Sequence, residues 1–404
     1  MNSDVVKTNE IEMMNEIFRD VVSKEAYQFM RTTFHRVKTF ESWRGRVNRS
    51  VQFFKEEKEA LNAMVFVFLL IKAEVEDDVK VNWNACIAYI ITRLIKKSLT
   101  WDMKPGYKRR LKNVMADFEE QVNEYVKSEV TKNVGERFYK CLFGLLDGMS
   151  KEEEQLYLVA KSYTDHVEYN FVESTVWFAE RNRIKQEIDE SMKLVDSYEH
   201  ISKEFGKLIS FISSSRNSLR WQGCGSTIDC SILCHMLETA ILAWFMAIEN
   251  NLDDRNEKIV PSQAFKVGLY HDIPELWTDD IPSICKNKIG KESDKNLRMV
   301  TEELEREVMN RHFYPVFSEK VATYLRANVM LEDIKDANLH KFIKRADYLS
   351  ADLECYWMIL HGSGNKLFYW ILWKSCNSNS RTPESKKLLR KMFFESLFHI
   401  PREA

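Results

Sequence analysis

One stretch in the second half of the chain, GLYHDIPELWTDDIP over residues 268–282, concentrates side chains that could do chemistry. It contains the adjacent pair His271 and Asp272, followed by Glu275 and Asp280. An imidazole and a carboxylate can both bind a divalent metal ion, and further carboxylates can move protons. The adjacent pair can share one ion only if the backbone turns both side chains to the same side. The pair alone is therefore a weak signal of an active site.

Two residues from other segments complete a set of four possible metal ligands. His235 lies in an apolar segment, and Asp347 lies in FIKRADYLSADLEC, where a core-facing helix has no structural need for a carboxylate. Two imidazoles and two carboxylates suit a hydrolytic divalent ion better than a thiolate-rich structural zinc site. We therefore expect a divalent cofactor, with Co, Mn, Mg, Fe, Ni and Zn all open. With positions left for water, such an ion acts as a Lewis acid and lowers the pKa of that water.

The two remaining acids of the stretch are candidates for proton transfer. Glu275 follows His271 by one helical turn and would share its face if the helix continues. It could orient or deprotonate the attacking water, and Asp280 could do the same or protonate the leaving oxygen. Asp279 is the alternative to Asp280, and the Asp-Ile-Pro context favours Asp280.

The elements that position these residues are predicted to be helices. Apolar residues recur at near-helical spacing, strand-like alternation is scarce, and 12 Gly and 7 Pro in 404 residues are too few for an all-β protein full of turns. We therefore predict an all-α fold. Helices are expected over residues 192–213, 231–248, 300–309, 341–360 and 386–398, with connections over 250–262 and 289–295.

The bulk composition excludes several classes of protein. A formal net charge of -2 gives no sign of a general affinity for nucleic acid or an anionic membrane. The eight cysteines form no disulfide framework and are expected to be reduced. The N-terminus is polar and acidic, and no uninterrupted apolar run is longer than residues 63–71, which is far shorter than the roughly 20 residues that span a bilayer. We expect a cytoplasmic protein.

The order and separation of the four candidate ligands resemble the H…HD…D signature of the HD-superfamily metal phosphohydrolases. The closer resemblance is to bacterial 5'-deoxynucleotidases of that superfamily. These have an Arg-Trp pair, a YHD-x-x-E-x-x-T-x-D-[LI]-P block and a K-x-A-D helix. The matching segments here are RW at 220–221, YHDIPELWTDDIP at 270–282 and KRAD at 344–347, within roughly residues 200–365.

The resemblance implies an HD-domain helical bundle and a role for each matched residue. Glu275 and Asp280 would serve the water and the leaving group. Arg220 would hold the 5'-phosphate, which suits a planar guanidinium with forked donors, and Trp221 would border the sugar or base. The implied metal ligands are His235, His271, Asp272 and Asp347.

The expected substrate is a nucleotide, most directly a deoxynucleoside 5'-monophosphate. HD proteins also cleave dNTPs, guanosine tetraphosphate and cyclic nucleotides, and these stay open as alternatives. The family usually has an acidic and a hydroxyl residue beside the first histidine, where this chain has Cys234 and Met236. That departure and the large first half leave open a third alternative, a non-catalytic module that senses nucleotides or binds a partner.

The first half of the chain aligns weakly with the second. Setting Trp83 against Phe265 also pairs other helical segments of the two halves and places Asp165 opposite Asp347. The other ligand positions fall on Phe54, Tyr89 and Ile90, with Arg93 opposite Glu275, so the first copy could not hold an ion. We predict a degenerate copy over residues 1–190 and the HD phosphohydrolase domain over 191–404. Because the related nucleotidases are homodimers, the copy could complete a pseudo-dimer within one chain. Regulator binding by the first half and further self-association stay open.

Overall fold

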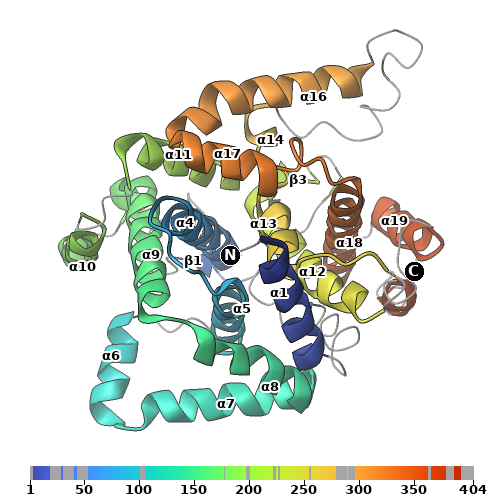
Figure 1. Cartoon of the computed structure of the whole chain (residues 1–404). Helices are drawn as coiled ribbons and strands as arrows, with labels where there is room; N and C mark the ends of the chain where they lie inside the picture. The colour runs from blue at the N-terminus through green and yellow to red at the C-terminus, as the bar shows by residue number, and fades with distance from the viewer. Residues whose placement is uncertain are drawn as a thin grey trace.

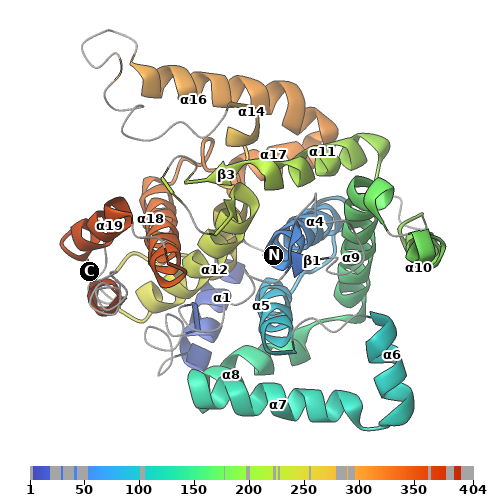
Figure 2. The same cartoon turned by 180° about the vertical axis from the view of Figure 1, so that it is seen from behind.

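The computed structural model shows a helical protein, and the predicted all-α class is confirmed (Figures 1 and 2). In the first half lie α1 (Ser3–Phe18), β1 (Glu41–Ser42), β2 (Phe53–Phe54), α4 (Lys55–Glu76), α5 (Trp83–Thr100), α6 (Pro105–Val114), α7 (Phe118–Asn133), α8 (Glu136–Gly144), α9 (Lys151–Val172) and α10 (Phe178–Asp196). In the second half lie α11 (Lys203–Ser214), β3 (Leu219–Arg220), β4 (Cys230–Ser231), α12 (Ile232–Asn251), α13 (Pro261–Tyr270), α14 (Glu275–Thr278), α16 (Leu297–Val308), α17 (Glu319–Asn328), α18 (Ala337–Leu360) and α19 (Lys366–Cys376). The structure describes residues 3–18, 29–30, 41–42, 53–100, 105–176, 178–196, 201–221, 224–225, 228–253, 256–278, 289, 296–362, 365–378 and 386–392.

The predicted helix over 192–213 is wrong as a single element. Its first residues end α10 and its last residues form α11. The hydroxyl of Ser202 accepts the backbone N–H of Phe205, which caps the new helix and gives it a start of its own. Periodicity continued across this point because both helices bury an apolar face.

Two helices, α4 and α12, form the centre of the core. Both are buried on almost every side, which is why their sequences are apolar nearly all round and lack a strong polar face. By length and composition alone α12 could cross a membrane, with a mean hydropathy of 1.5, but 94% of that window is buried inside the protein. Here α12 is the central core helix, packed along α13 and α18.

The halves show the same local sequence of elements. A two-residue antiparallel strand pair leads directly into a long buried helix in each, β1–β2 into α4 and β3–β4 into α12. The long helix then packs on a later helix, α4 on α9 and α12 on α18 (Figure 1). These parallels favour the tandem repeat, which stays a prediction, as does its boundary between residues 190 and 191.

Helices α4 and α5 of the first half pack against α13 of the second half. The hydroxyl of Tyr270 donates to the carbonyl of Met64 on α4 at 2.7 Å, and its ring lies 4.5 Å from that of Phe68. The ammonium of Lys266 lies 4.0 Å from the ring centre of Trp83. Buried apolar residues of both halves belong to one core. The end of α13, where the chemistry-bearing stretch begins, is therefore fixed by contacts with the first half.

Candidate metal centre

The first candidate ligand, His235, lies in the first turn of α12. The β3–β4 pair delivers the chain to this helix, and the hydroxyl of Ser231 accepts the N–H of Cys234 to cap it. The side chain of His235 is completely buried. A helix start next to a strand pair gives the imidazole a fixed position near the edge of the core.

A glycine allows α13 to approach α12 closely enough for the second histidine to reach the site. A Cβ on Gly268 would lie 2.9 Å from Cα of Ala240 on α12, a distance that real Cβ atoms essentially never show. Only glycine therefore fits at this crossing. His271 follows Gly268 by about one turn, so the close crossing brings its ring to 5.3 Å from that of His235.

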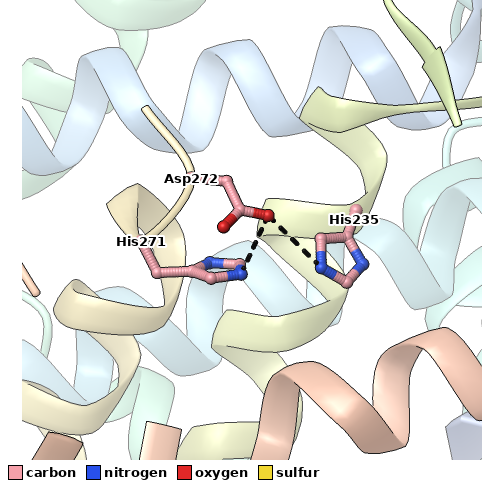
Figure 3. Close-up of side chains that lie close together, drawn as sticks. All are labelled: His235, His271 and Asp272. Carbon is pink, nitrogen blue, oxygen red and sulfur yellow. Dashed lines mark ion pairs between the residues drawn. The ribbon is translucent and has the colours of Figure 1, made fainter. Parts of the chain in front are cut away.

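The helix ends at Tyr270, and this end is what lets the adjacent pair point to one place. Residues 271–274 form turns, with the N–H of Glu275 bonded to the carbonyl of Asp272. Pro274 favours such an ending because it lacks an N–H and restricts the residue before it. Nε2 of His271 lies 3.1 Å from Oδ2 of Asp272 (Figure 3). The condition for a shared ion is met.

Three ligand atoms, one each from His235, His271 and Asp272, lie within 4.8 Å of one another. Asp347 joins them from α18, with Oδ1 at 3.1 Å from Nε2 of His235 and 3.9 Å from Nε2 of His271. Lys344, about one turn earlier on the same helix, lies 3.3 Å from the other oxygen of Asp347. The structure brings all four predicted ligands together.

The hydrogen bonds fix which ring nitrogen faces the cluster. Nδ1 of His271 donates to the carbonyl of Gly268 at 2.9 Å, which leaves Nε2 directed at the carboxylates. That buried Nε2 has no hydrogen-bond partner of acceptable geometry among the described residues. An imidazole nitrogen that points at carboxylates, and can lose its proton when an ion binds, is an arrangement that a metal ion completes.

The same holds for the other imidazole. Nδ1 of His235 lies 3.2 Å from both Oε1 of Glu354 and Oγ of Ser350. Ser350 donates its proton to Glu238, so both neighbours of Nδ1 accept and Nδ1 carries the hydrogen. Nε2 of His235 faces Oδ1 of Asp347 at 3.1 Å, where the carboxylate accepts its proton, and loss of that proton would free the Nε2 lone pair for an ion. The residues fit a divalent ion.

Charge in the site is unbalanced without a cation. Burial acts to lower the pKa of His271, but Asp272 and Asp347 overcome it and raise the pKa to about 10. Burial acts to raise the pKa of both aspartates, yet the neighbouring imidazoles and Lys344 hold each pKa below its usual range. Protons on the histidines compensate for two buried carboxylates, and a divalent ion can take their place.

The predicted phosphate-binding pair lies beside the metal cluster. Arg220 closes β3, and NH1 of its guanidinium lies 3.8 Å from Oδ2 of Asp272. Its Nε lies 3.3 Å from Glu354, which also accepts the indole N–H of Trp221 at 2.7 Å. An anion bound by Arg220 would therefore lie close to the ion.

The predicted proton-transfer residues are only partly placed. Glu275 begins α14, and the turns at residues 271–274 separate it from α13, so the condition that the helix continues to Glu275 is not met. Asp279 and Asp280 lie outside the described residues.

The first half holds an ion pair where the second holds the cluster. Counted from the start of each long helix, Lys58 of α4 occupies the place of His235 in α12, a register four residues from the one that sets Phe54 there. Its ammonium lies 2.5 Å from Asp165 and 2.9 Å from Glu168. A lysine between these carboxylates already supplies the positive charge. Among the described residues the cluster around His235 is the one group that could hold a metal.

Sequence reasoning missed the residues that orient the ligands. Glu354 is fully buried in α18, two turns after Asp347, and contacts Nδ1 of His235. Ser350 also contacts this nitrogen and donates its proton to Glu238. The available signal was a second acid two turns after Asp347 on the same face of the predicted helix.

An all-α bundle with this site is consistent with the HD-type phosphohydrolase predicted from the sequence. Residues 207–372, from α11 to α19, match the family model described as 5'-deoxynucleotidase YfbR-like. The match includes all four candidate ligands and the Arg220–Trp221 pair, and it confirms the resemblance for this part of the chain. Searches of curated proteins and of solved structures found no match.

Proposed function

We propose that the protein is a metal-dependent phosphohydrolase that removes the 5'-phosphate of deoxynucleoside monophosphates. The observation that carries the proposal is the convergence of two buried imidazole nitrogens and two carboxylates beside an arginine, within a segment that matches a nucleotidase family. A divalent ion held there would supply positive charge and acidify a water molecule.

Protein side chains carry out substrate binding and proton transfer. Arg220 neutralises charge on the phosphoryl oxygens as it develops, and its planar guanidinium orients the group for in-line attack. Glu275 accepts a proton from the attacking water, and Asp280 delivers one to the leaving 5'-oxygen. Trp221 borders the sugar or base.

A substrate panel tests this function. Purified protein is incubated with the deoxynucleoside and ribonucleoside 5'-monophosphates, dNTPs, guanosine tetraphosphate and cyclic nucleotides, each with Co²⁺, Mn²⁺ or Mg²⁺. We expect free phosphate from the deoxynucleoside monophosphates. Release of tripolyphosphate, pyrophosphate or a linear monophosphate instead would assign the site to one of the other HD reactions.

The non-catalytic alternative has less support from the structure than from the sequence. The departures that motivated it, Cys234 and Met236, are both buried, and Met236 belongs to the apolar core. The contacts of the His235 nitrogens are with Glu354, Ser350 and Asp347. Tight nucleotide binding in calorimetry, with no phosphate release under any ion, would establish the binding module and reject the enzyme.

A further inference from the structure

A single buried carboxylate links the metal cluster to the predicted phosphate-binding pair. Glu354 is completely buried in α18, on the helix that also carries Asp347. Its Oε1 lies 3.2 Å from Nδ1 of His235. Its Oε2 lies 3.3 Å from Nε of Arg220 and 2.7 Å from Nε1 of Trp221. Both oxygens accept, and each serves a different part of the site.

The backbone of Trp221 is strained, and the hydrogen bond from its indole to Glu354 helps to offset that strain. Its φ is 63°, in the left-handed region that non-glycine residues rarely adopt. The chain turns there, with the N–H of Cys224 bonded to the carbonyl of Trp221. The indole packs edge-on against Phe368, and its N–H meets Glu354. The contacts with Phe368 and Glu354 fix the position of the indole ring and help to stabilise the left-handed backbone conformation of Trp221.

Arg220 is oriented by the same carboxylate. Glu354 engages the Nε edge, while NH1 lies toward Asp272 and the cluster. An arginine with 13% of its side chain exposed keeps a fixed direction only if its buried edge is paired. The residue before His235 is Cys234, which contacts Ser231 and has no carboxylate. The carboxylate beside Arg220 is that of Glu354 in α18.

We propose that Glu354 is a positioning residue that holds the metal-binding imidazole and the Arg220–Trp221 pair in register, so that the ion and the phosphate meet at one fixed separation. The proposal rests on the proposed function for its substrate but on geometry for the coupling. It predicts that losing one carboxylate weakens metal binding and nucleotide binding together.

The direct test replaces Glu354 by its isostere. In Glu354→Gln the amide offers one acceptor oxygen, and its NH₂ meets an N–H donor on the other side. Calorimetry with Co²⁺ alone should show a roughly 10- to 100-fold weaker affinity, the usual effect of losing a carboxylate that orients a ligand histidine. The KM for a deoxynucleoside monophosphate should rise, and kcat should fall with it.

Trp221→Phe supplies a second, milder variant that keeps Glu354 and the metal ligands. It should raise the nucleotide KM and leave the Co²⁺ affinity unchanged. In the double variant Glu354→Gln, Trp221→Phe, the rise in KM should be smaller than the product of the two single effects, because both remove the same contact. Independent effects would overturn the coupling.

Asp352→Asn is the matched control. Asp352 is a buried acid of the same helix that accepts a hydrogen bond from Ser375 of α19. It should change stability but neither Co²⁺ affinity nor KM. If Glu354→Gln behaves like Asp352→Asn, the positioning role is wrong even where wild-type protein hydrolyses nucleotides. If wild-type protein releases no phosphate, Co²⁺ affinity and calorimetry with inorganic phosphate still decide the coupling, separately from the proposed function.

Discussion

The ammonium of Lys58 lies 2.5 Å from Oδ1 of Asp165, and Nε2 of His235 lies 3.1 Å from Oδ1 of Asp347. In each half, the fourth residue of a long buried helix faces an aspartate of a later helix. In one half the positive charge is a fixed side chain, and in the other the nitrogen is available to an ion. In the first half a lysine ammonium thus supplies the positive charge that an ion would supply in the second.

Lys58→Met should therefore destabilise the protein although it touches no catalytic residue. The change keeps the side-chain length but leaves Asp165 and Glu168 without their shared cation, and Glu168 is completely buried. Glu168 keeps Arg216 and Asp165 keeps Lys161, so the expected loss is roughly 1.5–3 kcal/mol, the value of hydrogen bonds to a charged group, and not the larger cost of an unpaired buried charge. Denaturant unfolding measures the loss. Lys161→Met, which removes a more exposed partner of Asp165, is the control and should cost far less; equal effects would contradict the account.

Gly268→Ala should disturb the crossing of α12 and α13. The new Cβ would meet the backbone of Ala240 at 2.9 Å, and a backbone atom cannot move aside cheaply. We expect a loss of roughly 1–3 kcal/mol in unfolding free energy together with weaker Co²⁺ binding, because His271 shifts with its helix. Gly144→Ala has no atom within 4 Å of the new Cβ and should be neutral or slightly stabilising. A neutral Gly268→Ala would show that the helices have room to separate.

Glu57 should make stability depend on pH. Burial raises the pKa of this carboxyl from 4.5 to about 7, against the opposing effects of Arg216 and of hydrogen bonds from Phe54 and Ser231. The folded state therefore favours the protonated form, and the stability that protonation gives is present below pH 4.5 and lost as pH rises through 7.

Glu57→Gln removes that titration and keeps an acceptor oxygen. The variant should gain stability over wild type by on the order of 2 kcal/mol at pH 8, and the gain should shrink toward pH 5. Thermal unfolding at both values measures it. A gain that is the same at both, or larger at pH 5, would mean that Glu57 does not titrate in this way.

The helical class and the grouping of the four candidate ligands were predictable from the sequence, because they depend on apolar spacing for the helices and on residue type and order for the site. The crossing at Gly268 was not predictable, since one glycine in a helix gives no sign of which backbone it will meet. Nor was Glu354, whose importance depends on contacts with β3 and α12 that are distant in the chain. The alignment of the first half stays a prediction, and counting from the helix starts sets Lys58 in place of Phe54 opposite His235. Amphipathic helices align equally well after a shift of one turn, and only the strand–helix junction at Phe54 distinguishes the two alignments.

The most direct test of the account is the return of phosphatase activity to chelator-stripped protein. Phosphate release from deoxynucleoside monophosphates is followed as Co²⁺, Mn²⁺ or Mg²⁺ is added back, for wild type, His271→Ala and Asp347→Ala, with helical content measured by circular dichroism. The account predicts that the ion restores wild-type activity, and that both variants stay inactive with their helical content largely unchanged. Full metal-dependent activity in both variants would contradict it.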